Sequence, residues 1–172
     1  WLVGLGGVLG VLLLEAVSVV LMVGGVGVAL QGGAWHVVMV EQFRICLPGQ
    51  TLEAAGGQLD EEDISGRMAA ELDEEAKIKV DPKDIKIVTA GYIQPSMMPA
   101  KAYGGIVLIT EEQLPTQLLC GEHQFDEFTV VAIRPLLDLL RQRDRLELMS
   151  DFETHALLDA VAEAVGLITR NY

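Results

Sequence analysis

Residues 56–80 have the sequence GGQLDEEDISGRMAAELDEEAKIKV, the most informative segment of the chain. From 63 to 79 apolar residues recur one turn apart, which predicts an amphipathic helix. At about 100° per residue, Glu71, Glu74 and Glu75 fall within one arc beside the apolar face. Like charges one turn apart destabilise an isolated helix, so the three glutamates require a counter-charge. A divalent cation would meet this requirement, and carboxylate oxygens favour Mg²⁺, or Mn²⁺, over zinc. The alternative to a metal site is a helix face whose glutamates are simply exposed to solvent.

The composition of the whole chain limits the number of domains and the classes of binding partner. The 172 residues, 51% of them hydrophobic, suit a single domain with a buried core. Twelve Lys and Arg against 25 Asp and Glu give a net charge of -13. This balance argues against binding to nucleic acid or to an anionic membrane, yet allows a phosphate-bearing substrate held through a divalent cation.

The two cysteines, Cys46 and Cys120, lie far apart and form no CxxC pair. Neither a disulfide framework nor a zinc cluster is therefore expected. This favours an intracellular protein, with the cytoplasm as the first expectation and an organelle as the alternative.

The apolar segment Leu2–Leu30 contains a single charged residue, Glu15, and is long enough to span a bilayer. Repeated glycines interrupt it, and no basic cluster flanks it to set an orientation or to begin a secretory signal. Short runs of Val and Gly favour buried strands, so residues 1–25 are expected to form N-terminal strands. A membrane-tethered acidic domain is the alternative.

Hydrophobic periodicity predicts further elements on both sides of the acidic helix. Strands are expected at 16–23, 27–31, 35–41, 85–93, 105–110 and 128–133, and helices at 63–79, 134–145 and 151–167. Irregular segments are expected at 45–57, 94–103 and 111–126. This order predicts one α/β domain over residues 1–172, with a mixed β-sheet covered by helices on both sides.

The acidic helix resembles the signature of the Nudix hydrolases. That signature is a glycine, five residues, a glutamate, seven residues, and then R-E-U-x-E-E-x-G-U, where U is a bulky apolar residue. Gly56, Glu62 and the segment AELDEEAKI at 70–78 keep this spacing. Two positions depart from it, since Ala70 stands where the family has arginine and Lys77 where it has glycine.

The glycine of the signature has two alternative assignments. The run LEAAGGQLDEE at 52–62 resembles that of ADP-sugar diphosphatases. That alignment makes Gly57 the signature glycine and leaves the spacing one residue short, whereas Gly56 preserves the spacing.

The resemblance extends to two other segments and weakens in a third. VEQFR at 40–44 resembles the strand before the signature in ADP-ribose diphosphatases, and GEHQFDEF at 121–128 resembles their acidic loop. The segment PSMMPAKAY at 95–103 departs from the Ser-Pro-Gly segment of that subfamily.

The resemblance implies a Nudix-type α/β/α sandwich and a set of site residues. The implied metal ligands are Glu71, Glu74, Glu75 and the backbone carbonyl near Ala55 or Gly56; the implied catalytic bases are Glu122, Asp126 and Glu127; and the implied substrate-binding residues are Arg44, Glu53 and Ser96. Arg67, one turn before Glu71 on the same side of the helix, is expected to replace in part the arginine missing at position 70.

The resemblance also implies an activity, which is Mg²⁺-dependent hydrolysis of the diphosphate linkage in a nucleotide sugar such as ADP-ribose or an ADP-sugar. The products are a nucleoside monophosphate and a sugar phosphate. A homodimer formed through the N-terminal strands is implied as well. The departures at Ala70 and Lys77 leave open an alternative, a non-catalytic Nudix-fold binding or assembly module.

Overall fold

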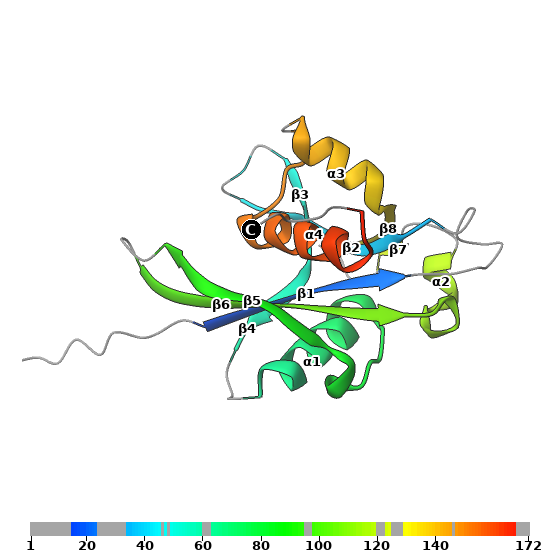
Figure 1. Ribbon diagram of the computed structural model, residues 1–172, viewed down its shortest axis with the longest axis horizontal. Coiled ribbons are helices and arrows are strands. Elements are labelled where there is room, and N and C mark those ends of the chain that lie inside the picture. Colours follow the sequence, from blue (N-terminus) through cyan, green and yellow to red (C-terminus); the bar gives the residue numbers. More distant parts are fainter. Residues whose placement is uncertain are drawn as a thin grey trace, which may run out of the picture.

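The computed structural model describes residues 15–23, 34–45, 47, 49–59, 63–94, 98–119, 123–124, 129–145 and 147–167 (Figure 1). Its strands are β1 (Glu15–Val23), β2 (His36–Phe43), β3 (Gln50–Glu53), β4 (Ala55–Gln58), β5 (Lys86–Gln94), β6 (Met98–Ile109), β7 (His123–Gln124) and β8 (Thr129–Pro135). Its helices are α1 (Ile64–Ala76), α2 (Thr116–Leu119), α3 (Leu136–Asp144) and α4 (Phe152–Ala164), with short 3₁₀ turns at Pro82–Asp84 and Glu111–Gln113.

In the described residues the strands form one mixed sheet in the order β5-β6-β1-β2-β8-β7, with β3 paired to β2 and β4 paired to β1. β1 runs parallel to β6, and the other strand pairs are antiparallel. The expected mixed α/β architecture is therefore confirmed. β1 lies near the middle of the sheet, hydrogen-bonded to β6 along one edge and to β2 and β4 along the other.

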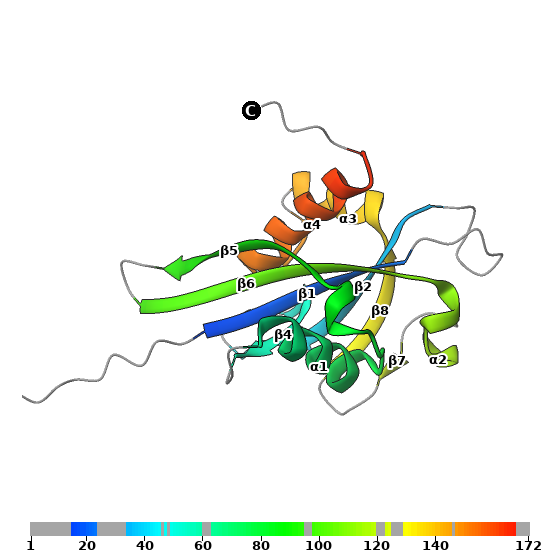
Figure 2. The same cartoon turned by 60° about the horizontal axis from the view of Figure 1, so that its bottom comes forward.

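Helices cover both faces of this sheet, as the two views in Figures 1 and 2 show. On one face α1 and α2 bury a core against the sheet, made of Met68, Leu72, Ala76, Leu118, Val38, Val40, Val107 and Val131 with their neighbours. On the other face α3 and α4 bury a second core, made of Leu136, Leu139, Leu157, Leu158, Val161, Val37, Met39 and Ile106 with their neighbours.

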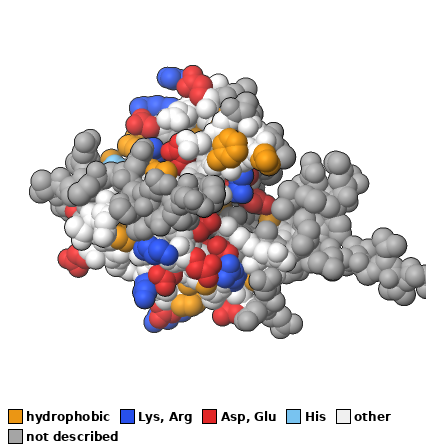
Figure 3. All heavy atoms as spheres, turned by 180° about the vertical axis from the view of Figure 1, so that it is seen from behind, with side chains coloured by type: hydrophobic (Ala, Val, Ile, Leu, Met, Phe, Trp, Pro, Cys, Tyr) orange, Lys and Arg blue, Asp and Glu red, His pale blue; other side chains and the backbone are white. Residues whose placement is uncertain are grey.

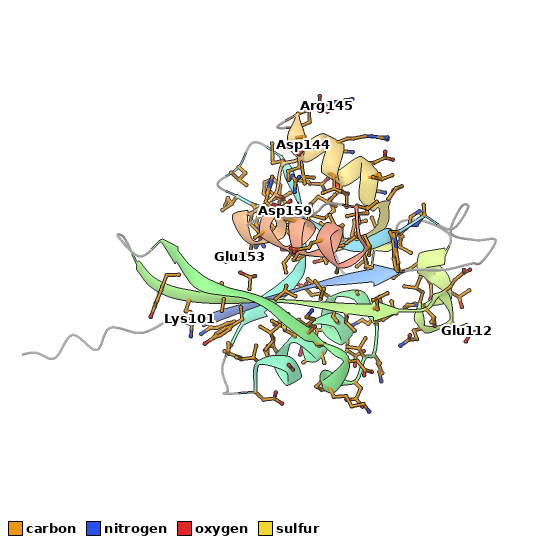
Figure 4. The ribbon with its side chains drawn as sticks, in the orientation of Figure 1. Lys101, Glu112, Asp144, Arg145, Glu153 and Asp159 are labelled. Carbon is orange, nitrogen blue, oxygen red and sulfur yellow. The ribbon has the colours of Figure 1, made fainter. Side chains whose placement is uncertain are left out.

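The strand β2 contributes to both cores, which explains its unbroken apolar run. Successive side chains of a strand point to opposite faces. Val38 and Val40 accordingly enter the α1 core, while Val37 and Met39 enter the α3–α4 core. On that second face Asp159 of α4 forms an ion pair with Arg143 of α3, which joins the two helices (Figure 4).

The helix α1 is bounded by specific capping contacts. Asp63 is its N-cap, and the Asp63 carboxylate accepts the backbone N–H of Gly66 at 2.9 Å. At the other end Lys77 takes a left-handed conformation (φ 57°, ψ 31°), and the N–H groups of Lys77 and Ile78 both reach the carbonyl of Leu72. This turn directs Ile78 into the core, where it is fully buried. The helix consequently ends at Ala76 and not at 79 as the periodicity predicted.

Three predicted irregular segments contain regular structure. The segment 45–57 includes β3 and most of β4, residues 98–103 belong to β6, and 111–126 contains a 3₁₀ turn, α2 and β7. These expectations were wrong because the strands form through their partners and not through their own propensity. Gly56 and Gly57, poor strand formers, pair with β1 across a regular antiparallel ladder. The predicted strand at 27–31 lies outside the described residues.

The apolar segment Leu2–Leu30 contains β1, a strand of the central sheet, which confirms the strand expected at 16–23. Among the described residues no helix combines the length and the apolar character needed to cross a bilayer. Because both edges of β1 are bonded within the chain, a dimer through residues 1–25 requires contacts other than β1 backbone pairing. Residues 1–14 lie outside the described part.

The left-handed Lys77 leads to a stability prediction. A side chain in this region costs about 1 kcal/mol or slightly more relative to glycine. Lys77→Gly is expected to raise the free energy of unfolding by about 1 kcal/mol, and the melting temperature by about 2–4 °C. The control Lys77→Ala loses the contact of Lys77 Nζ with the Glu74 carbonyl (2.8 Å) but keeps the strained backbone, so no gain is expected. Equal melting temperatures for all three proteins would contradict the prediction.

Candidate functional site

The candidate site lies where the ends of β2, β3 and β4 meet α1. In the β2–β3 ladder Val40 pairs with Glu53 and Gln42 pairs with Thr51. Val40 belongs to the α1 core, so Gln42, Thr51 and Glu53 point to the same face as that helix. The polar ends of three strands are thereby brought under the acidic turn of α1.

Glu75 is fixed by two donors from the sheet. Its carboxylate accepts the backbone N–H of Gly56 at 3.1 Å and the side-chain amide of Gln42 at 3.2 Å. Burial raises the pKa of Glu75 from 4.5 to about 7, and the negative charge of Glu71 acts in the same direction. The hydrogen bonds from Gly56 and Gln42 lower the pKa only in part.

Glu71 is buried, with 4% of its surface exposed, and packs directly on β4. A Cβ atom added to Gly57 would collide with the carboxylate of Glu71, so any residue larger than glycine here would displace that carboxylate. Of the two alternative signature glycines, Gly57 therefore makes the close approach to the helix, while Gly56 provides an N–H group. The sequence alone left these two roles open.

Arg67 supplies the counter-charge for two of the three glutamates. Arg67 Nη2 forms an ion pair with Glu71, and Arg67 Nη1 lies 3.3 Å from Glu74 Oε1. Its Nε donates to the backbone carbonyl of Gln58 at 3.2 Å, which holds the guanidinium between α1 and β4. The expectation that Arg67 compensates the helix carboxylates is confirmed at the level of contacts.

Arg44 and Glu53, both predicted to bind substrate, contact each other. Arg44 Nε lies 3.0 Å from Glu53 Oε1, a second Arg44 nitrogen pairs with Oε2, and the Thr51 hydroxyl donates to Oε1 at 2.5 Å. Burial alone would raise the pKa of Glu53, but the hydrogen bonds from Arg44 and Thr51 outweigh it and hold the pKa below its ordinary value. Glu53 thus stays ionised and orients Arg44, whose side chain is half-exposed.

The described part of the site carries excess negative charge. Four carboxylates, those of Glu53, Glu71, Glu74 and Glu75, face two guanidinium groups, those of Arg44 and Arg67. Acidic and basic side chains lie side by side over the lower part of Figure 3, the part of the molecule that contains α1. Oxygen donors with surplus negative charge match a hard divalent cation in chemical type.

The donors do not converge on one point, however. Among the described residues no three acidic, histidine or cysteine side chains are arranged to hold a metal ion. Glu71 and Glu74 are turned toward Arg67, and Glu75 is turned toward Gly56 and Gln42. Ala55, the predicted carbonyl ligand, lies in β4 paired with Val19 of β1.

The remaining predicted site residues, Glu122, Asp126, Glu127 and Ser96, lie outside the described residues. One neighbouring contact bears on the acidic loop. Thr129, two residues after Glu127, pairs with Gln42, the residue whose amide binds Glu75. The chain therefore enters β8 directly beside the candidate site.

Sequence reasoning missed two members of the site, Gln42 and Thr51. The available signal was the position of Gln42, a polar residue two places after Val40 and hence on the inward face of a buried strand. Thr51 had no comparable signal, because β3 was not predicted as a strand.

A comparison of the chain with protein-family models and with curated proteins finds no match in either case.

The close packing of Gly57 against Glu71 gives the second prediction. Gly57→Ala forces the buried, ion-paired Glu71 carboxylate to move, and we expect a loss of about 1–3 kcal/mol in the free energy of unfolding. The matched control is Gly91→Ala in β5, where an added Cβ meets no atom within 4 Å and a change below about 0.5 kcal/mol is expected. Urea unfolding of both variants measures the difference. Equal effects would show that Gly57 carries no special packing constraint.

The raised pKa of Glu75 predicts a pH dependence of stability. The folded protein binds the proton of Glu75 more tightly than the unfolded chain does. The free energy of unfolding of the metal-free protein should therefore fall as the pH rises from about 4.5 to about 7, and the contribution is constant above that range. Because Glu75 is partly exposed, we expect a loss of about 1–2 kcal/mol. Glu75→Gln should remove this slope in urea titrations with EDTA. Identical pH profiles for the variant and the parent protein would contradict the assignment.

Proposed function

We propose that this chain is a Nudix-type hydrolase that cleaves the diphosphate linkage of a nucleotide sugar, with Mg²⁺, or Mn²⁺, as cofactor. The observation that carries the proposal is the excess of carboxylates on one side of α1, where Glu71 and Glu75 meet the ends of β2 and β4 and Glu74 pairs with Arg67 beside them. The spacing of the three glutamates in the sequence supports the same family. The mixed sheet with helices on both faces supports a Nudix-type α/β/α sandwich.

Glu71, Glu74 and Glu75 would hold the cation, with a backbone carbonyl near Ala55 as a further oxygen donor. When bound, a divalent cation neutralises phosphate charge and lowers the pKa of an attacking water. Glycine at position 57 permits the close approach of α1 to β4 that keeps Glu71 beside the strand.

Arg44 suits the binding of an anionic group of the substrate. Its guanidinium is charged at all ordinary pH values and is fixed at one end by Glu53, while half of the side chain remains exposed. A guanidinium held in this way binds phosphate oxygens with little further loss of side-chain freedom.

The proton of the attacking water requires a base, which we assign to Glu122, Asp126 or Glu127. The pairing of Thr129 with Gln42 supports this assignment, since Thr129 follows Glu127 by two residues and pairs with the strand that contacts Glu75. A carboxylate in this position would accept the proton while the phosphorus–oxygen bond to the leaving phosphate breaks.

ADP-ribose and ADP-sugars are the proposed substrates, because segments 40–44 and 52–62 resemble the diphosphatases for these compounds. The products are then AMP and a sugar phosphate. Ser96 remains a proposed substrate contact. A homodimer, an intracellular location and the absence of a nucleic-acid partner stay predictions from the sequence.

A specific observation favours a second candidate, a non-catalytic binding or assembly module of the same fold. Arg67 already neutralises Glu71 and Glu74, and Lys77 occupies a left-handed position suited to glycine. In a protein that no longer binds a cation, the carboxylates of the acidic helix would be neutralised by a side chain of the protein itself, as Arg67 does here.

An activity assay tests the main proposal. With ADP-ribose and Mg²⁺ we expect AMP, measured by ion-exchange chromatography, and the double variant Glu74→Gln/Glu75→Gln should lower the rate by about 100-fold or more. The matched control is Asp73→Asn on the same helix, since Asp73 pairs with the exposed Lys79 at 3.9 Å and not with the site. It should retain the parent rate within about twofold.

The substrate panel decides between the two candidates. Absence of AMP from ADP-ribose, ADP-glucose and dinucleotides would overturn the hydrolase proposal. If calorimetry then still detected binding of ADP-ribose, the non-catalytic module would be the better description.

A further inference from the structure

The guanidinium group of Arg67 occupies the side of α1 on which the proposed cation would bind. It contacts Glu71 and Glu74 together, which are two of the three carboxylates assigned to that cation. The third, Glu75, points toward Gly56 and Gln42. Two of the three carboxylates are therefore held by Arg67 and the third is held by the sheet.

We propose that Arg67 is a positioning residue that competes with a divalent cation for Glu71 and Glu74, so that the cation binds only as Arg67 moves away. This inference rests on the proposed function, because it takes the acidic helix as the cation site. It concerns how tightly the site binds a cation, a property that the sequence spacing does not determine.

The surroundings of Arg67 allow such a movement. The side chain is 28% exposed, whereas that of Glu71 is almost completely buried. Within the described part of the sheet, Arg67 Nε donates one hydrogen bond, to the Gln58 carbonyl. Arg67 can thus turn into solvent while Glu71 stays against Gly57.

Charge balance gives the direction of the effect. Arginine keeps its proton at all ordinary pH values, so Arg67 can leave the carboxylates only as a cation. While the Arg67 guanidinium contacts Glu71 and Glu74, its positive charge repels an incoming Mg²⁺ or Mn²⁺. The guanidinium also contacts carboxylate oxygens that would otherwise bind the ion. Removal of this charge should strengthen cation binding, although it removes an ion pair from the protein.

The test measures Mn²⁺ binding alone, without substrate, by electron paramagnetic resonance of the free ion. Arg67→Gln is expected to lower the dissociation constant for Mn²⁺ about tenfold relative to the parent protein. The matched control Lys79→Gln removes the same charge from an exposed side chain paired with Asp73, and it should change the constant less than about twofold.

A second readout separates competition from a structural role. Without metal, Arg67→Gln leaves Glu71 buried without this partner, so a lower melting temperature is expected. Saturating Mn²⁺ should close most of this gap. If Arg67 were only structural, the gap would persist with metal and the dissociation constant would not fall.

A milder variant covers the case in which Arg67→Gln does not fold. Arg67→Lys keeps one positive charge but lacks the fork that reaches both carboxylates. It should bind Mn²⁺ about threefold more tightly than the parent protein. An unchanged or larger constant overturns the inference.

Two results distinguish this inference from the proposal beneath it. If the parent protein binds Mn²⁺, Glu75→Gln weakens binding and neither Arg67 variant tightens it, competition is excluded and the cation site stands. If neither the parent protein nor Arg67→Gln binds Mn²⁺ at millimolar concentrations, the cation site and this inference both fail.

Discussion

The contact of Glu71 with Gly57 and Arg67 is the constraint on which the site depends. A carboxylate buried at this depth is tolerated only with a charged partner, which Arg67 supplies. The same carboxylate lies so near Gly57 that a side chain on β4 would displace it. Helix, strand and counter-charge therefore fix each other, and the relative position of α1 and the sheet follows from their combination.

The negative charge of the site is compensated at two separate places, one around Arg67 and one around Arg44. Arg67 compensates Glu71 and Glu74 on α1, and Arg44 compensates Glu53 on β3. Glu75 accepts hydrogen bonds from the neutral donors Gly56 and Gln42, and burial together with the charge of Glu71 raises its pKa. A site of this composition is stabilised by positive charge, which Arg67 supplies at Glu71 and Glu74.

The sequence predicted the features that depend on local pattern. The period of Met68 and Leu72 predicted the helix, the apolar pattern at 35–41 predicted a strand, and the position of Arg67 predicted its pairing with Glu71. It failed where pairing with another strand or packing against a helix decides the structure. Short strands such as Gln50–Glu53 form because β2 offers a ladder partner, and the roles of Gly56 and Gly57 depend on how α1 approaches β4. The sequence also could not predict whether the carboxylates of the three glutamates converge. Their spacing shows that they share one face of the helix, but it does not show which positively charged group each carboxylate contacts.

The position of β1 in the middle of the sheet has a consequence for biosynthesis. β1 comprises residues 15–23, but the strand that covers one of its edges, β6, begins only at Met98. On the ribosome, β1 therefore emerges long before this partner, and one edge of the strand stays unpaired while some seventy further residues are made. Contacts so distant along the chain form slowly and leave strand edges open to wrong partners. The sheet on which α1 packs can therefore be completed only late in translation, after β6 has been made.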